Sequence, residues 1–288
     1  MNKSYSKQIS NREVNGSVNA AQTKGVLSPE GQLRTNLSAT VDLRKNENLE
    51  HNSSMIKNHK NKQNINREVN GNVNAAQTKN DVHGFLHAAE QGDAFAQCYL
   101  GLMYANGFGV PKDSAEAIKW YRLAADQGHA KAQHNLGMMY LLGDGARKDE
   151  VESVKWFRKA ADQGDAGAQN NLGVVFAKGE GVPKDSAQAV KWFRKAAEQG
   201  NADAQSSLSV MYYYGEGVPI DFAKTFEWCR KAAEQGNAYA QARLGLMYQR
   251  GKGVRQNRAK AVKWYRKAAE QGDAFVQDIC KFVLECAS

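Results

Sequence analysis

Proline, cysteine and long apolar runs are all scarce in this sequence. Only four of the 288 residues are proline, and only four are cysteine. No run of about 18 apolar residues occurs, so we expect no transmembrane helix. The start of the chain lacks the apolar stretch of a secretory signal. The cysteines share no repeat position and form no C-x-x-C pair, which predicts buried, reduced thiols instead of a disulfide framework or a zinc site: Cys98, Cys229, Cys280 and Cys286.

Aromatic residues are almost missing from the N-terminal part. Residues 1–80 contain one aromatic side chain, Tyr5, together with sixteen Asn, and all five Trp lie further along the chain. Such a polar segment cannot bury enough apolar surface to offset the entropy lost on ordering. We therefore predict a disordered, Asn-rich tail over 1–80 and a folded domain over 81–288.

The predicted tail contains an internal duplication. The segment NREVNGSVNAAQTK at 11–24 returns as NREVNGNVNAAQTK at 66–79. We interpret the two copies as a duplicated linker. A short binding motif that is displayed twice, with a gain in avidity, is the alternative.

The rest of the chain repeats itself every 36 residues. A period of this length is typical of stacked supersecondary units. Within one unit we predict a first helix over 94–106 and a second over 114–127, with Asp93 and Asp113 as N-caps and Gly107 ending the first helix. The sequence therefore predicts an all-α solenoid of helix-turn-helix repeats. The interval is marked without a slip by Gly92, Gly128, Gly164, Gly200, Gly236 and Gly272.

The first helix of each unit has one face whose residues recur. A glycine in mid-helix costs about 1 kcal/mol relative to alanine. We therefore expect the recurring Gly101 to allow close approach of the second helix, through its backbone or its Trp. At helical spacing the recurring residues gather on one side: Ala94, Gln97, Leu100, Gly101 and Tyr104.

The second helix has its own recurring stripe, and we expect Ile118, Tyr121, Ala124 and Ala125 to point inward. One Trp per unit flanks this stripe. An aromatic residue at fixed helical spacing is typical of a core, so we predict that the indoles are packed between hairpins: Trp120, Trp156, Trp192, Trp228 and Trp264.

The repeated frame AxAQxxLGxMYxxGxGVPKDxxxAxKWYRKAAxQG resembles the Sel-one-like repeat family, which is related to tetratricopeptide repeats. The likeness covers about residues 81–288, as five full repeats over 93–272 and a half repeat at each end. The resemblance implies an α-α superhelical solenoid. It also implies a non-catalytic scaffold or adaptor that binds proteins or peptides.

The first helices also carry positions that vary between units, opposite the recurring face. Because solenoid curvature makes an extended concave surface available, we predict a groove there for a peptide or a partner protein. Asn135 and Asn171 would hold a peptide backbone, since amide side chains both donate and accept. A solvated wall without a ligand is the alternative. The candidate groove residues are Tyr99, Asn106, Lys131, Asn135, Asn171, Lys178, Asp203, Ser207, Tyr214, Tyr239, Arg243 and Arg250.

Basic residues line the second helices, beginning with Lys119 and Arg122. An acidic residue four positions after each Arg, such as Asp126, offsets part of this charge. We interpret the row as a solvated outer face and expect no nucleic-acid partner. Binding of nucleic acid or of an anionic membrane is the alternative.

Catalytic signals are weak. His83 and His87 lie four residues apart, but Gly84 occupies the place of the Glu that a zinc-protease helix needs. No serine lies in a G-x-S-x-G turn. We therefore expect no enzyme activity, no catalytic residue, no metal and no cofactor.

Two biological roles stay open. The first is a cytoplasmic adaptor. The second is an exported bacterial effector or virulence-associated interaction protein, delivered through its tail without an ordinary signal peptide. The apolar C-terminal segment, with Phe275, Ile279 and Phe282, adds self-association as a third possibility.

Overall fold

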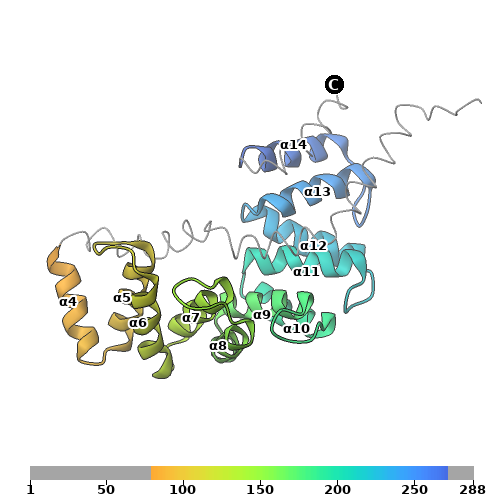
Figure 1. Cartoon of the computed structure of the whole chain (residues 1–288). Coiled ribbons are helices and arrows are strands. Elements are labelled where there is room, and N and C mark those ends of the chain that lie inside the picture. The colour runs from red at the N-terminus through yellow and green to blue at the C-terminus, as the bar shows by residue number, and fades with distance from the viewer. Residues whose placement is uncertain (1–78, 272–288) are drawn as a thin grey trace, which may run out of the picture. The chain divides into compact units, whose positions relative to one another are not determined.

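The structure is a computed structural model that describes residues 79–271. This part of the chain is entirely helical and contains no strand, which confirms the all-α prediction for these residues. The predicted tail lies outside the described residues, except that Lys79 and Asn80 begin the first helix, and so does the C-terminal segment around Phe275. The helices (Figure 1) are α4 (Lys79–Glu90), α5 (Ala94–Asn106), α6 (Ser114–Asp126), α7 (Ala130–Leu142), α8 (Glu150–Asp162), α9 (Ala166–Lys178), α10 (Ser186–Glu198), α11 (Ala202–Tyr214), α12 (Phe222–Glu234), α13 (Ala238–Arg250) and α14 (Arg258–Ala269).

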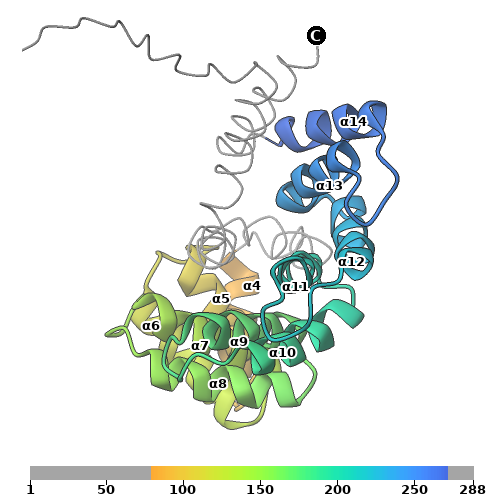
Figure 2. The ribbon, with the colours of Figure 1, turned by 90° about the vertical axis from the view of Figure 1, so that its right-hand side faces the viewer.

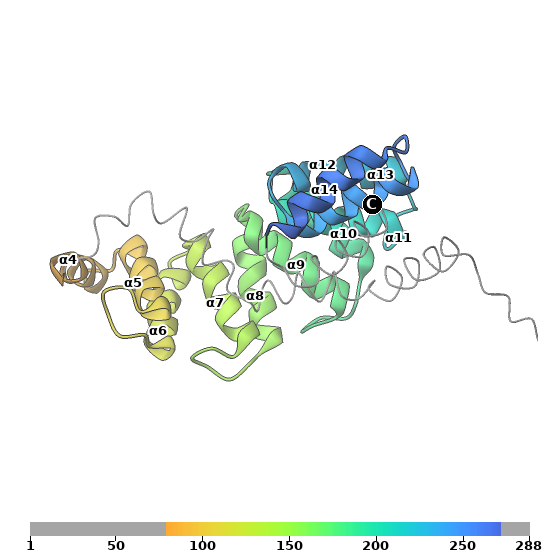
Figure 3. The ribbon, with the colours of Figure 1, turned by 90° about the horizontal axis from the view of Figure 1, so that it is seen from above.

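The helices pair into hairpins that stack in chain order. Within α5–α14, the second helix of each pair packs on the first helix of the next, and α4 packs on α5 (Figures 2 and 3). The predicted caps form: the Asp93 carboxylate accepts a hydrogen bond from the Ala96 N–H at 2.6 Å. Asp113 accepts from two N–H groups of α6. Gly107 ends α5 with a left-handed φ of 76°, a conformation that glycine adopts without strain.

Glycines in mid-helix let the two helices of a hairpin touch. A Cβ on Gly173 would lie 2.5 Å from the ring of Phe193. The ring belongs to the residue that follows the Trp, so the expectation that the Trp makes this contact is wrong. The second-helix backbone also comes close at Gly137, where a Cβ would lie 3.2 Å from the Ser153 carbonyl oxygen. The hairpin α11–α12 departs from the rule, with Ser209 and Cys229 at the equivalent positions, both buried. The glycine–ring contact recurs as Gly101–Tyr121, Gly137–Phe157 and Gly245–Tyr265.

Buried glutamines join each hairpin to its neighbours. The Gln169 amide donates to the Ala161 carbonyl at the end of α8 at 3.1 Å. Its Oε1 accepts a hydrogen bond of 2.8 Å from the Gln199 amide, just after α10. A buried polar side chain whose partners are all present fixes one arrangement of the helices around it. The same two bonds recur at Gln97, Gln133, Gln205 and Gln241.

The tryptophans are less buried than predicted. Trp156 is 6% exposed, and the other four are partly buried and pack against the edge of the hydrophobic core instead of lying fully inside it. A lysine three residues later covers the ring, with Lys159 Nζ 3.9 Å from the Trp156 centroid and Lys195 Nζ 4.3 Å from the Trp192 centroid. Such cation–π contacts keep the charge near solvent while the lysine stem covers apolar surface. The same stacking recurs at Trp228 and Trp264.

Candidate interaction surfaces

The predicted groove residues all lie on the first helices, α5, α7, α9, α11 and α13. None of them is fully exposed. Asn171 and Ser207 are buried, at 5% and 1% exposure, and the other ten are partly buried. The row is therefore closed by packing in its middle, and its accessible side chains are the partly buried ones on either side.

The asparagines of this row are engaged inside the solenoid. The Asn106 amide donates to a carbonyl one turn earlier in α5 at 2.9 Å. Asn135 hydrogen-bonds to the buried Tyr121 hydroxyl. The Asn171 amide lies 3.0 Å from His134 Nε2. The Asn106 bond lies within α5, whereas Asn135 and Asn171 each contact a neighbouring helix. The structure therefore does not bring Asn135 and Asn171 together as a ladder open to a peptide.

The charged members of the row also have neighbours. The Asn237 amide donates to Asp203 Oδ1 at 2.9 Å. Burial raises the pKa of the Asp203 carboxyl, and this hydrogen bond offsets part of that effect. The Arg243 guanidinium lies 5.6 Å from the centroid of the Tyr213 ring. Lys178 Nζ lies 3.7 Å from a Glu180 carboxylate oxygen.

An aromatic cluster lies at the N-terminal end of the row. The Tyr99 ring stacks on Phe85 at 4.3 Å and on Phe95 at 6.4 Å between centroids. Phe95 is 61% exposed, which makes it the most exposed large apolar side chain in the described part of the chain. Tyr99 is thus the groove candidate with open apolar surface beside it.

His134 forms a buried polar contact that the sequence analysis did not single out. Its Nδ1 lies 3.0 Å from Oδ1 of Asp165, the N-cap of α9, although without the alignment of a hydrogen bond. Burial alone would raise the pKa of Asp165, but His134, the Ala168 N–H and Lys131 together lower it to about 2. A Cβ on Gly167 would lie 2.4 Å from His134 Cε1, so the glycine makes room for the ring. The signal in the sequence was this glycine at a place where other repeats carry larger residues.

Two arginines of the second helices, Arg122 and Arg194, each contact an aromatic ring on the first helix of the next hairpin. The equivalent position holds Tyr140 in the repeat before Phe176 and Tyr212 in the repeat after it. In these two repeats the tyrosine hydroxyl accepts a hydrogen bond from the arginine. Phe176 has no hydroxyl, and Arg158, which stands opposite it, has no hydrogen bond or ion pair within residues 79–271. The arginine–tyrosine contacts that do form join Arg122 to Tyr140 and, at 2.8 Å, Arg194 to Tyr212.

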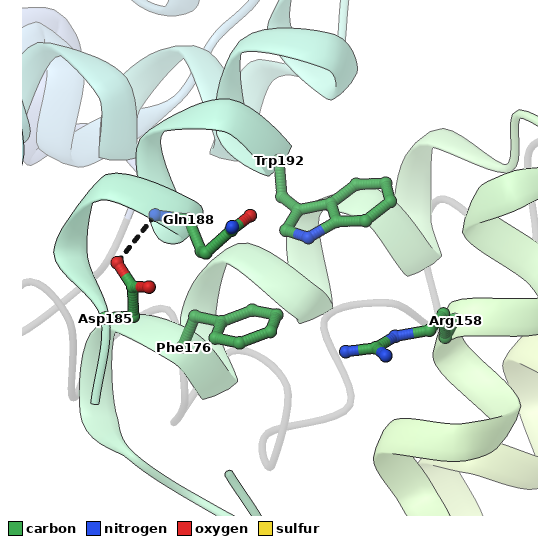
Figure 4. Close-up of a pocket in the computed structure, with 5 residues that line it drawn as sticks. All are labelled: Arg158, Phe176, Asp185, Gln188 and Trp192. Atoms are coloured by element: carbon green, nitrogen blue, oxygen red, sulfur yellow. Dashed lines mark hydrogen bonds between the residues drawn. The ribbon is translucent and has the colours of Figure 1, made fainter. Parts of the chain in front are cut away.

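A pocket of about 510 Å³ opens where this hydroxyl is missing. Figure 4 shows the Arg158 guanidinium extending from α8 toward the rings of Phe176 and Trp192. The other two lining residues are Asp185 and Gln188. Asp185 Oδ1 accepts a hydrogen bond from the Gln188 N–H at 2.9 Å, which caps α10. The pocket therefore combines two aromatic walls with one uncommitted guanidinium.

The comparisons with known proteins agree with this architecture. The model of the Sel1 repeat family matches more than half of the chain, as five consecutive repeats at residues 94–129, 130–165, 166–201, 202–237 and 238–273. The chain belongs to the Sel1 repeat family. Solenoids of this family are in general protein–protein interaction scaffolds.

Two solved structures are similar to this Sel1 repeat chain. A Sel1 repeat protein from Oxalobacter formigenes is 38% identical, with a TM-score of 0.67, and the match covers 73% of this chain and 86% of that one. The protein c5321, a protective antigen present in uropathogenic Escherichia coli strains, is 43% identical with a TM-score of 0.65. That match covers 70% of this chain and 44% of the E. coli protein, so the chain spans less than half of that protein's length. A comparison with curated proteins found no match.

The thiols of this Sel1 repeat chain are poor nucleophiles in the described part. Cys98 and Cys229 are unpaired and buried, and burial raises the pKa of both to about 12. They are therefore protonated at neutral pH, whereas the thiolate is the reactive form. Within residues 79–271, no cluster of His, Cys, Asp and Glu could hold a metal ion, and no helix is long and apolar enough to cross a membrane.

Proposed function

We propose that this Sel1 repeat chain is a non-catalytic scaffold that binds a peptide or a segment of a partner protein across its first helices. The observation that supports this best is the contrast within those helices. They share one buried pattern, whereas the candidate groove residues differ from repeat to repeat. Different side chains on a common frame give a solenoid its specificity without altering the stack.

In this proposal the partly buried members of the row make the contact. Tyr99 offers ring surface beside the exposed Phe95, and Tyr239 and Arg250 lie on α13 toward the other end. Tyrosine and arginine are enriched among the residues that dominate binding energy at protein interfaces. The buried Asn171 and Ser207 then shape the floor of the surface instead of touching the partner.

The test removes three cations from the proposed surface of the full chain, with Lys131→Ala, Lys178→Ala and Arg250→Ala combined. The readout is quantitative mass spectrometry of proteins captured from the source cell. We expect partners that the original chain captures to be depleted roughly tenfold or more, because central interface residues each contribute more than about 1 kcal/mol. Far-UV circular dichroism checks that helicity is unchanged.

A matched control removes the same charge from the second helices, with Lys119→Ala, Lys155→Ala and Lys263→Ala combined. These lysines are exposed on the other side of the stack. Capture is expected to remain within about twofold of the original chain. Equal capture by both triple variants would show that the first-helix surface does not bind the partner.

A second candidate is an exported interaction protein, and one observation favours it. The similar E. coli protein is described as a protective antigen, and an antigen is by definition recognised by a host immune system. Fractionation of a tagged chain decides between the two roles. Recovery from the cytoplasm alone supports the adaptor, and recovery from the medium or from host cytosol supports the exported form.

A further inference from the structure

The hollow beside Trp192 is not used by the function proposed above, because none of the candidate groove residues lines it; its lining comes from α8, the end of α9 and the start of α10. It opens where the repeat has Phe176 in place of a tyrosine. The Arg122 and Arg194 guanidinium groups are each held by a tyrosine hydroxyl of the next hairpin. One repeat after Arg194, Arg230 lies 3.9 Å from Glu234 instead of bonding to Tyr248. For Arg158, Phe176 withdraws the hydroxyl acceptor. The result is an exposed arginine that points toward two aromatic rings (Figure 4) and has no hydrogen bond or ion pair within the described residues 79–271.

We propose that the pocket lined by Arg158, Phe176, Asp185, Gln188 and Trp192 binds the carboxylate side chain of an acidic peptide segment in a partner protein. Asp185 is the acidic member of the lining, and its Oδ1 accepts a hydrogen bond from the Gln188 N–H as the N-cap of α10. This surface is separate from the first-helix row. The partner is recognised by a Glu or Asp next to an apolar residue. The carboxylate pairs with the guanidinium, and the apolar neighbour lies against the rings.

The chemistry of the lining residues supports a carboxylate. A guanidinium presents parallel N–H donors that match the two oxygens of a carboxylate. The indole nitrogen of Trp192 faces the same space (Figure 4), and an indole N–H only donates. The Gln188 amide offers a further donor at the rim. The two aromatic rings shield one side of the pair from water, which strengthens a charge-assisted hydrogen bond.

The charge around the pocket favours an acidic segment over an isolated acid. A second hollow lies on the other side of Trp192, lined also by Lys191, Arg194, Lys195 and Glu198. Across the two hollows, cations outnumber the two carboxylates, Asp185 and Glu198. Lys195 stacks on the Trp192 ring and so holds its charge at the junction of the two hollows. A positive surface of this kind attracts an acidic chain before the specific contact forms.

The test observes Trp192 directly through its indole N–H in ¹H–¹⁵N correlation spectra of the full chain. The Trp192→Phe variant assigns the signal. The probe is an end-capped peptide of alternating Glu and Leu, and the matched probe replaces each Glu by Gln. We expect a saturable shift of the Trp192 signal with the Glu peptide and at least a tenfold weaker response with the Gln peptide.

Three variants then locate the carboxylate. Arg158→Gln removes the cation, and Phe176→Tyr supplies a hydroxyl like those that hold Arg122 and Arg194. Each is expected to weaken the Glu peptide roughly tenfold or more, because a hydrogen bond to a charged group is lost or diverted. Arg122→Gln is the control. It changes the same residue type at the equivalent place one repeat earlier, and affinity should stay within about twofold.

Specific outcomes would overturn the proposal. They are equal affinity for the Glu and Gln peptides, unchanged affinity in both Arg158→Gln and Phe176→Tyr, or no shift of the Trp192 signal. A short single-stranded DNA that binds more tightly than the Glu peptide and displaces it would also overturn it, since the surface would then recognise phosphates. Failure here leaves the first-helix proposal intact, because the two tests alter different residues.

Discussion

The neighbouring hairpins α9–α10 and α11–α12 fill the same interior space in different ways. In α9–α10, Gly173 faces the large ring of Phe193, and in α11–α12 the equivalent positions hold Ser209 and the small Cys229, both buried. Volume has moved from one helix to its partner. Because protein interiors are close-packed, a change on one helix requires an opposite change on the other. Interior departures from the repeat therefore come in matched pairs.

The departure at Phe176, on α9 opposite Arg158 of α8, is different. The hydroxyl found on Tyr140 and Tyr212 is missing, and no second change provides a new partner for Arg158. The space is an open surface pocket, so packing does not demand a matching substitution. The contrast suggests that unmatched departures at the surface are the places where a repeat protein acquires individual binding sites.

The largest expected effect tests the interior half of this comparison. Phe193→Ala empties the space in front of Gly173 and should lower the free energy of unfolding by about 3–5 kcal/mol. Cys229→Ala removes a much smaller side chain, and the loss should be about 1 kcal/mol. Urea unfolding followed by circular dichroism measures both. Similar losses in the two variants would mean that the two hairpins are not packed as described.

A double-mutant cycle sharpens the same point. Cys229→Phe alone overpacks the space against Ser209 and should cost about 1–3 kcal/mol. Ser209→Gly alone introduces a helical glycine at a cost of about 0.5 kcal/mol. Together they rebuild the glycine–ring contact, so a favourable coupling energy of about 1–3 kcal/mol is expected. Additive losses would contradict the idea of a matched pair.

The 36-residue period predicted the helices, their caps and the buried stripe, because these depend on spacing along one chain. The spacing does not predict which side chains of neighbouring helices contact each other. The tryptophans pack on the core with one face, as predicted, but the lysine three residues later covers the ring at Trp156 and Trp192, which the spacing did not predict. The Asn171 amide contacts His134 of the preceding hairpin instead of facing a groove. The pocket lies where Phe176 replaces the tyrosine of the neighbouring repeats. The sequence shows this replacement, but only the structure shows that Arg158 lies opposite it.

The His134–Asp165 contact extends the comparison to pH. The folded-state pKa of Asp165, about 2, lies below its ordinary value of 3.8. The ionised carboxylate therefore stabilises the fold above about pH 4, and this contribution of about 2 kcal/mol is lost as the pH falls toward about 2. Asp165→Asn keeps an N-cap, so it should flatten the stability profile in this window.

The control for that prediction is Asp149→Asn, which changes an exposed N-cap of the same type on α8. Urea midpoints are measured for both variants between about pH 2 and pH 6. Asp165→Asn should lose more stability than Asp149→Asn at pH 6, with the difference vanishing near pH 2. Parallel profiles for the two variants would show that His134 does not stabilise the Asp165 carboxylate.

The smallest effect bears on the unmatched departure itself. Phe176→Tyr supplies the acceptor that Arg158 lacks and should raise the free energy of unfolding by about 0.5–1 kcal/mol, whereas Tyr212→Phe, which releases Arg194, should lower it by a similar amount. If the pocket binds a carboxylate, the same Phe176→Tyr change makes the chain more stable and weakens the Glu peptide. A variant that gains stability and loses binding would show that the binding site lowers the stability of the fold. Unchanged stability of the Phe176→Tyr variant would instead mean that Arg158 does not bond to the added hydroxyl. The lack of a hydroxyl at position 176 would then not explain the pocket.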